Sequence, residues 1–312
     1  MQTGADQDDT LYVGIDGGGS RCRALIVQGA QVLGQGEGGP ANPYHGLERA
    51  VGSILAAVDA ALTEAGLPAA AKSELVAGMG LAGVNVARVY QQMQEAKLPF
   101  RHSYLTTDLH IACMGAHGQE EGAVIVAGTG TCGFARVGGQ SFMLGGHGFP
   151  LGDIGGGAWL GLEAVKAVLL AVDGLGPATG LSEYLKEQLQ AEGLQLVERL
   201  QNAKSSDYAR LAPAVFHAAE QGDGVARSIV TRGADYLNGL ARQLWQLGPP
   251  RMTMIGGVSE QIGQWMDQAL MARLSAPLQA PVYGALHFAR AEWLQRSRHN
   301  LRDTPCGDPS AP

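Results

Sequence analysis

The stretch YVGIDGGGSRCRALIV, residues 12–27, places two apolar, β-prone runs on either side of a glycine-rich turn. An ordinary hairpin turn needs one or two glycines to reach positive φ. This turn has three in succession, Gly17, Gly18 and Gly19, directly after Asp16. Consecutive glycines expose main chain that a bulky group can approach closely. The stretch therefore predicts a strand–turn–strand unit whose turn binds a ligand.

Composition and charge restrict the class of protein. The chain has 312 residues, of which 46% are hydrophobic, so it can form two domains with substantial cores. Its net charge of −7 argues against a nucleic-acid or membrane-surface binder, because either would need a basic face. No apolar run approaches the length of a membrane span. We therefore expect neither nucleic acid nor membrane among its partners.

The cysteines and the first residues indicate a compartment. Cys22, Cys113, Cys132 and Cys306 form no CxxC pair and have no zinc-type spacing. The start, MQTGADQDDT, is too acidic and polar for a signal peptide. Both observations favour a reduced, cytoplasmic setting.

Strands and helices alternate along most of the chain, and their order begins again midway. GAVIVAGTGTCGFARVGG, residues 122–139, repeats the strand, glycine turn and strand of the first stretch, and helices follow it. This restart predicts an α/β protein of two lobes. Its expected parts are a first lobe (11–118), a second lobe (119–283), a helix that completes the first lobe (284–296) and a flexible tail (297–312).

The second turn, GTGTCG, formally matches the GxGxxG of dinucleotide-binding folds. In those folds the third glycine opens a helix, whereas FARVGG here reads as a strand and a turn. A Walker A loop is excluded because GxxxxGKS/T does not occur. Each hairpin alone could be a simple tight turn, but two in equivalent places favour a nucleoside triphosphate held between them. The residues expected to bind its phosphates are Gly17, Gly18, Gly19, Ser20, Arg21, Gly128, Thr129, Gly130 and Thr131.

Five stretches in order resemble the motifs of the N-acetylglucosamine kinase/BadF-type ATPase family, within the sugar kinase–actin–Hsp70 superfamily. They are GIDGGGSRCRAL, TTDLHIACMGAHG, IVAGTGTCGFARV, GGHGFPLGDIGGGAWLG and MTMIGGVSE. The resemblance is greatest to bacterial glucosamine kinases, through GAHGQEEGAVIVAGTGTCG, VLLAVDG and YGALHFA. It implies a two-lobed actin-like, ribonuclease H-like α/β fold with duplicated mixed sheets, flanking helices and a central cleft. It also implies the use of ATP and Mg²⁺.

Asp16 and Asp108 each follow a β-like run. Both have a structural interpretation, because Asp-Gly often forms an Asx-type turn and Asp often caps a helix. The resemblance implies that Asp16 holds hydrated Mg²⁺ on the ATP phosphates and that Asp108 is the catalytic base for the sugar's 6-hydroxyl. Mg²⁺ usually takes one or two protein carboxylates, and phosphoryl transfer needs mainly alignment and charge neutralisation. A capping position would fix the direction of the Asp108 carboxylate, so its two interpretations are compatible.

The resemblance also implies a sugar site, formed by Asn42, Asp108, Gly146 and Asp153. A surface loop is the alternative for Asn42, and a helix cap is the alternative for Asp153. Two positions depart from the family pattern. Ile154 stands where an acidic or amide residue is common, and it cannot hydrogen-bond a hydroxyl. His147 stands where tryptophan is common, and a histidine in a glycine loop is more often a local hydrogen-bonding residue than a catalyst.

The adenosine site is implied by IGGVSE, where Gly256 and Gly257 would let the nucleoside approach closely. AAEQGD, residues 218–223, is similar to the neighbouring adenine-contacting turn. The alternative for both stretches is an ordinary loop between a helix and a strand.

These expectations predict a kinase that transfers the γ-phosphate of ATP to the 6-hydroxyl of glucosamine, with N-acetylglucosamine as the alternative acceptor. An activator ATPase of the BadF type would need cysteines for an iron–sulfur cluster at a dimer interface, and the cysteine positions do not show that arrangement. A sugar or nucleotide sensor on the same scaffold would not need both Asp16 and Asp108. We also expect a homodimer, formed through exposed helical faces.

Overall fold

The computed structural model describes residues 9–118 and 121–302. Within them the chain forms two compact units, one from residues 9–118 and 278–302 and the other from residues 121–277. The chain returns to the first unit at Leu278, earlier than the expected helix over 284–296. The amides of Leu278 and Gln279 account for this, because they donate to the carbonyl oxygens of Ala116 and Gly115 at 3.0 Å each.

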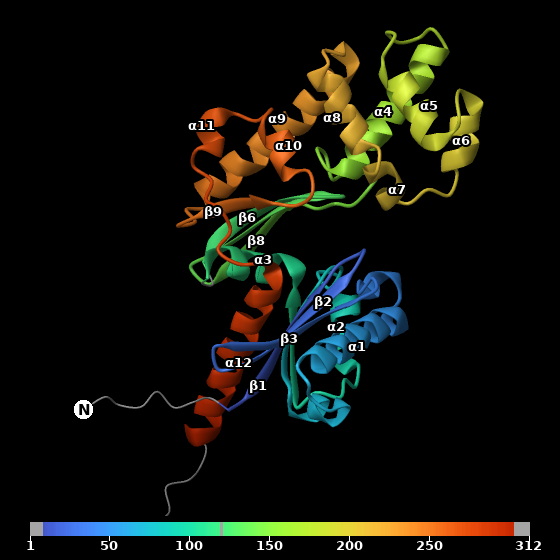
Figure 1. Ribbon diagram of the computed structural model, residues 1–312. Helices are drawn as coiled ribbons and strands as arrows, with labels where there is room; N and C mark the ends of the chain where they lie inside the picture. The colour runs from blue at the N-terminus through green and yellow to red at the C-terminus, as the bar shows by residue number, and fades with distance from the viewer. Residues whose placement is uncertain (1–8, 119–120, 303–312) are drawn as a thin grey trace, which may run out of the picture. The chain divides into compact units, whose positions relative to one another are not determined.

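The first unit is built on a five-stranded mixed sheet of order β3-β2-β1-β4-β5. β1, β2 and β3 are antiparallel, whereas β4 and β5 run parallel to β1. Figure 1 shows α1 and α12 beside this sheet, and both helices contact it. The strands are β1 (Leu11–Gly17), β2 (Cys22–Gln28), β3 (Gln31–Gly38), β4 (Val76–Leu81) and β5 (His102–Thr107). The helices are η1 (Pro43–His45), α1 (Leu47–Glu64), η2 (Ala69–Glu74), α2 (Ala87–Glu95), α3 (Asp108–His117) and α12 (Pro281–Arg302).

Glycines let the helices of this unit lie close to the sheet. Side chains added at Gly14 and Gly78 would overlap the backbone of α12, and one at Gly80 would overlap Ile111 of α3. These three glycines share one face of the sheet with Asp16, since β1 and β4 pair in parallel register. On the other face, Ile15, Met79 and Leu81 are buried against residues of α1 and α2. Much of the glycine content of this lobe is therefore explained by packing.

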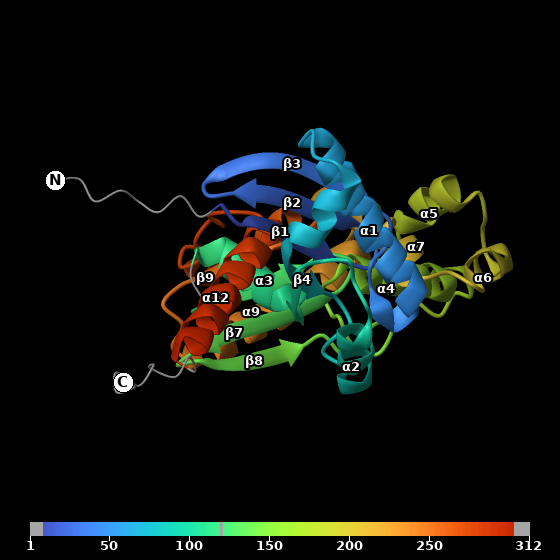
Figure 2. The ribbon, with the colours of Figure 1, turned by 90° about the horizontal axis from the view of Figure 1, so that it is seen from below.

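The second unit repeats the pattern with a four-stranded sheet of order β8-β7-β6-β9. β6, β7 and β8 are antiparallel, and β9 runs parallel to β6. Figure 2 shows β7 and β8 of this sheet beside each other, with α9 overlying it. The strands are β6 (Gly122–Ala127), β7 (Thr131–Val137), β8 (Gln140–Gly145) and β9 (Met252–Ile255). The helices are α4 (Gly157–Val172), α5 (Leu181–Leu189), α6 (Leu194–Leu200), α7 (Ser205–Ala209), α8 (Ala212–Glu220), α9 (Gly224–Gln246), α10 (Ser259–Gly263) and α11 (Gln268–Met271).

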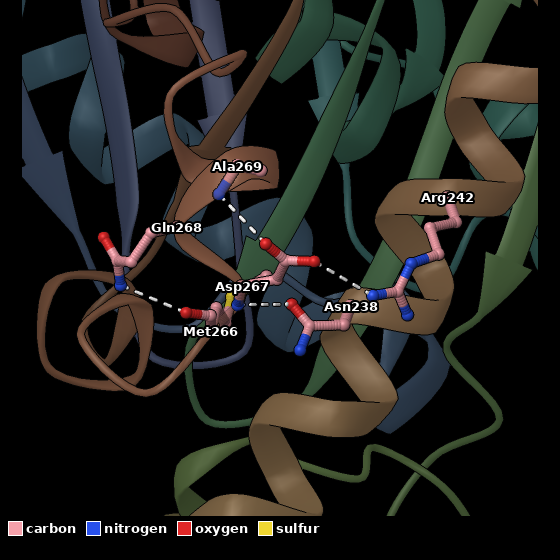
Figure 3. A network of polar contacts seen from close by, with 6 residues as sticks. All are labelled: Asn238, Arg242, Met266, Asp267, Gln268 and Ala269. Carbon is pink, nitrogen blue, oxygen red and sulfur yellow. Dashed lines mark hydrogen bonds and ion pairs between the residues drawn. The ribbon is translucent and has the colours of Figure 1, made fainter.

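The pattern SEQIGQWMDQALMARL predicts one continuous helix after β9, but the structure has two short helices, α10 and α11. Asp267 makes the break, because its carboxylate accepts a hydrogen bond from the Ala269 amide and caps α11. The same carboxylate contacts Arg242, and the Asp267 amide donates to the Asn238 side chain (Figure 3). These contacts attach the segment after β9 to α9.

The predicted α/β fold with duplicated mixed sheets and flanking helices is confirmed. Cys22, Cys113 and Cys132 form no disulfide within the described residues, and Cys306 lies outside them, as does most of the expected tail. Across residues 9–118 and 121–302, no helix has the length and apolar character needed to cross a membrane.

Candidate functional site

Two carboxylates of the first unit lie at the same edge of its sheet. Asp16 is the penultimate residue of β1 and pairs in register with Gly80, which pairs in turn with Thr106. Asp108 follows β5 directly and begins α3. The carboxyl ends of parallel strands meet at one edge, so this topology brings together residues that are far apart in the sequence.

Burial raises the pKa of both carboxylates, and the charge of Asp16 adds to the shift of Asp108. Burial and, to a smaller extent, the negative charge of Asp16 together raise the pKa of Asp108 to about 6. The hydrogen bond from the Leu109 amide opposes this shift. Part of the Asp108 side chain still reaches the surface. Burial also raises the pKa of Asp16, against the positive charges of Arg23 and Arg21. A pair of oxygen ligands that repel each other is a donor set that a divalent cation would stabilise.

Asp108 is not the helix cap that its position suggests. The cap of α3 is Thr107, whose hydroxyl oxygen accepts a hydrogen bond from the His110 amide at 3.2 Å. Asp108 is the first helical residue, and its Oδ1 accepts from the Leu109 amide at 2.9 Å. The carboxylate is therefore oriented by the helix N-terminus, while its second oxygen is not used by that bond.

The first glycine turn has glycines of two kinds. A side chain at Gly17 would overlap Leu81, so this glycine is needed for packing. Gly18 and Gly19 have open space around them, with nothing closer than 3.6 Å to an added Cβ, and neither has positive φ. Ser20 and Arg21 are exposed beside them. The bare backbone predicted from the sequence is therefore present at Gly18 and Gly19.

Asn42 lies next to this turn. The Ala41 amide donates to the Gly18 carbonyl oxygen at 3.0 Å, which fixes the segment against the turn. The Asn42 Oδ1 accepts from the Tyr44 amide at 2.9 Å and lies where a side chain at Gly83 would be. This bond leaves the Asn42 side-chain amide nitrogen for another partner.

The second glycine turn is bound tightly to the segment that follows β8. The carbonyl oxygens of Gly128 and Thr129 accept from the amides of Gly157 and Ala158, at 2.8 and 2.9 Å. The Thr131 hydroxyl donates to the Ile154 carbonyl oxygen at 2.8 Å. Ile154 thus contributes its backbone here, and its apolar side chain packs against the core.

Asp153 lies directly against this turn. A side chain at Gly130 would overlap the Asp153 carboxylate, whose Oδ1 accepts from the Gly148 amide at 3.3 Å. Burial raises its pKa, against the amides of Gly148 and Thr131 and the charge of His147. Asp153 has a φ of 60°, a backbone conformation that is uncommon outside glycine and is often found at functional sites.

Two neighbours of Asp153 complete this part of the unit. Gly146 has a φ of 67°, and its amide donates to the Thr131 carbonyl oxygen at 3.1 Å. The hydroxyl of Tyr236, on α9, lies 2.6 Å from the position of an added Cβ at Gly145. Burial raises the pKa of Tyr236, and the charges of Asp153 and Cys132 add to the shift. Sequence analysis missed Tyr236, because only the tertiary fold brings α9 next to Gly145.

A pocket of about 300 Å³ opens beside the second glycine turn. Gly256, with a φ of 117°, would overlap the Ala127 carbonyl oxygen if it had a side chain, and it brings the loop after β9 to the pocket wall. The residues that line the pocket come from the glycine turn, α4, the α7–α8 region and the loop and helix after β9. They are Gly128, Thr129, Gly157, Ala209, Ala212, Pro213, Phe216, Gly257, Val258 and Gln261.

The adenine-contacting turn expected at residues 218–223 does not line this pocket. Asp223 instead accepts hydrogen bonds from Thr179, Gly180 and Ala226, and it caps α9. A larger hollow of about 580 Å³ lies among α5, α6 and α7, and it contains none of the residues singled out from the sequence. The smaller pocket is therefore the better candidate for a nucleotide, because it adjoins the glycine turn.

Known proteins are similar to this chain over most of its length. Glucosamine kinase GspK of Vibrio cholerae is 33% identical over 93% of this chain and 97% of its own length. N-acetyl-D-glucosamine kinase of Dictyostelium discoideum is 26% identical over 75% of this chain and 80% of its own. The crystal structure of a candidate N-acetylglucosamine kinase from Chromobacterium violaceum superimposes with a TM-score of 0.85 at 28% identity, covering 90% of this chain and 99% of that one. Residues 13–289 match the BadF/BadG/BcrA/BcrD ATPase family. The chain therefore belongs to the BadF/BadG/BcrA/BcrD ATPase family, as its motifs predict.

Proposed function

We propose that this protein is an amino-sugar kinase that transfers the γ-phosphate of ATP to the 6-hydroxyl of glucosamine. A bond forms between the sugar's O6 and the γ-phosphorus, and the bond from that phosphorus to the bridging oxygen of ADP breaks. The hydroxyl proton passes to Asp108. The observation that carries the proposal is the position of Asp16 and Asp108 at one sheet edge, where burial first and the charge of Asp16 second raise the pKa of Asp108 to about 6.

A carboxylate with this pKa suits a general base at neutral pH. It is ionised before the reaction, yet it is basic enough to accept a proton as the hydroxyl attacks. Asn42 is close to the first glycine turn and would contact the sugar, together with Asp153 and the Gly146 backbone of the second unit. The positive φ of Asp153 supports a functional position for it.

The nucleotide is assigned to the two glycine turns and the pocket of the second unit. The open backbone at Gly18 and Gly19, with Ser20 and Arg21, would bind phosphate oxygens, as would the Thr129 hydroxyl and the backbone of Thr129 and Gly130. Gly128 and Thr131 would shape this turn, because the Gly128 amide and the Thr131 hydroxyl already donate to Gly130 and Ile154. Gly257 would lie against the nucleoside, since it lines the pocket beside Gly128.

Asp16 would hold Mg²⁺, with water completing its coordination. When bound, this cation neutralises charge on the phosphates. Asp16 fits that role because it lies at the same sheet edge as Asp108 and its charge raises the pKa of that residue. Burial raises the pKa of Asp16 itself, and the charges of Arg23 and Arg21 oppose that rise.

Glucosamine is preferred over N-acetylglucosamine because its kinase from Vibrio cholerae is the more similar of the two curated kinases. The test is a coupled ADP-release assay with glucosamine, N-acetylglucosamine, N-acetylmannosamine and glucose. We expect the highest kcat/KM for glucosamine. A higher value for N-acetylglucosamine would reassign the acceptor, and comparable rates with glucose would contradict an amino-sugar kinase while leaving the kinase chemistry in place.

We also propose a homodimer in a cytoplasmic setting. Exposed apolar side chains at Leu170, Val172 and Leu194 of α4 and α6 are available for association. Light scattering coupled to gel filtration measures the mass directly, and a monomer at micromolar concentration would contradict the proposal.

A further inference from the structure

The pocket beside the second glycine turn combines bare backbone with apolar walls. Gly128 and Thr129 belong to the turn, where phosphate would bind. Pro213, Phe216 and Val258 add apolar side chains to the lining. A flat nucleobase fits such walls, because small-molecule sites combine apolar surfaces with a few polar groups that set specificity.

Gln261 adds a polar side chain to this lining. Among the described residues that line the pocket, only Thr129 and Gln261 carry polar side chains. Gln261 is half-buried in α10, and its amide makes no hydrogen bond with another described residue. A half-buried amide without a protein partner can hydrogen-bond to water, and a ligand in the pocket would replace those bonds with its own. Gln264, on the same short segment, is exposed and does not line the pocket.

We propose that Gln261 contacts the edge of the nucleobase and lets the enzyme use both purine donors. The inference rests on the proposed function, because it assumes that the pocket holds the nucleoside of the phosphate donor. A side-chain amide presents one acceptor and two donor hydrogens side by side, and a half-turn exchanges their places.

The chemistry of the amide predicts tolerance of both purines. Adenine presents an amino donor beside a ring-nitrogen acceptor, which one orientation of the amide matches. Guanine presents a carbonyl acceptor beside a ring N–H donor, which the opposite orientation matches. Since either base can be paired, Gln261 discriminates weakly, and the enzyme uses GTP as well as ATP.

The variant Gln261→Glu tests this reading, with Gln264→Glu as the matched control. A carboxylate only accepts hydrogen bonds, so it suits the two adjacent N–H donors of guanine and opposes the ring nitrogen of adenine. We expect wild-type kcat/KM values for ATP and GTP within about tenfold of each other, since one neutral hydrogen bond contributes little net energy. Gln261→Glu should shift the ratio towards GTP by about tenfold, and Gln264→Glu should leave it unchanged.

Binding supplies a second readout that needs no sugar. Calorimetric dissociation constants for ADP and GDP should show the same shift in ratio as the kinetics. Gln261→Met keeps the size of the side chain without its hydrogen bonds, and it should weaken both nucleotides equally. This variant keeps the test decisive if Gln261→Glu does not fold.

The outcomes separate the two proposals. If wild-type protein binds ADP and GDP but phosphorylates no amino sugar, the proposed function fails while the role of Gln261 is still decided by the binding ratios. Equal ratios for the Gln261 and Gln264 variants would overturn the inference alone. Discrimination between ATP and GTP above about 10³ in the wild type would overturn it as well, because a rotatable amide cannot supply that much.

Discussion

The two glycine turns occupy equivalent places in their sheets, since each joins the first two strands of an antiparallel meander. They differ in what packs against them. The first turn has open space at Gly18 and Gly19, and its carboxylate, Asp16, comes from the adjoining strand. The second is bound to the segment after β8, and its carboxylate, Asp153, comes from that segment. One hairpin design therefore serves two chemical settings, an exposed turn beside a carboxylate pair and a turn fixed against a single carboxylate.

The largest effect that we expect comes from the carboxylate pair at the first turn. Asp108→Asn should lower kcat by about 10²–10⁴-fold, the usual contribution of a general base. The same change should raise the free energy of unfolding at pH 7 by on the order of 1–2 kcal/mol, discounted because Asp108 is partly exposed. ADP release and thermal melting measure the two effects.

The sign of the stability change follows from the raised pKa. The folded-state pKa of Asp108, about 6, lies above its ordinary value of 3.8. The folded protein therefore holds this proton more tightly than the unfolded chain does, and stability from this group falls as pH rises from about 4 to 6. Asn removes that cost at neutral pH. Asp173→Asn, at an exposed helix end, is the control and should change neither quantity. A variant of Asp108 that melts lower and still turns over would contradict both roles.

Asp153→Asn tests the setting of the second turn. We expect the KM for the sugar to rise about 10–100-fold, because an uncharged amide is a weaker acceptor for sugar hydroxyls than a carboxylate. The dissociation constant of ADP should change by less than about twofold, and calorimetry measures it. Asparagine tolerates positive φ, so the backbone should be retained. An equal weakening of sugar and ADP would show that the second turn and Asp153 act as one site.

The pH dependence tests whether the two carboxylates of the first unit are coupled. The rate with saturating ATP and subsaturating sugar should fall below pH 6, because protonated Asp108 cannot accept the hydroxyl proton. At pH 5 we expect about a tenfold loss relative to the plateau. Replacing Asp16 by Asn should lower the pKa of Asp108, since the charge of Asp16 helps to raise it. Carboxyl-carbon NMR titration measures that pKa without turnover, and an unchanged midpoint would mean that the pair is not coupled.

The smallest effect concerns stability at the first glycine of each turn. Gly17→Ala should lower the free energy of unfolding by about 1–3 kcal/mol, because its Cβ would overlap Leu81. Gly128→Ala should change it by less than about 0.5 kcal/mol, since nothing lies within 4 Å of its Cβ. Urea denaturation compares the two variants. Similar destabilisation of both would mean that contact with Leu81 is not what requires glycine at position 17.

Local patterns in the sequence predicted the strands and the glycine turns, because alternation of apolar runs and glycines is itself a local property. The break between α10 and α11 was missed because it depends on Asp267, whose partners Asn238 and Arg242 lie on a distant helix. The pocket residues Phe216 and Gln261 were missed for a related reason. Neither belongs to a motif, and only packing of α8 and α10 beside the glycine turn brings them together. Sequence therefore predicted the parts of the candidate site that adjoin strand ends, whereas the walls of the pocket required the tertiary structure.

The return of the chain at Leu278 has a consequence for protein synthesis. The strands of the first unit leave the ribosome early, but α12, which covers Gly14 and Gly78, is translated only after the whole second unit. The nascent first sheet therefore keeps a bare face while a complete domain is made behind it, and such exposed surfaces attract chaperones and promote misassembly. The segment translated first is the last to receive its final covering, so a ribosome stalled before Pro281 would display an unfinished lobe beside a finished one.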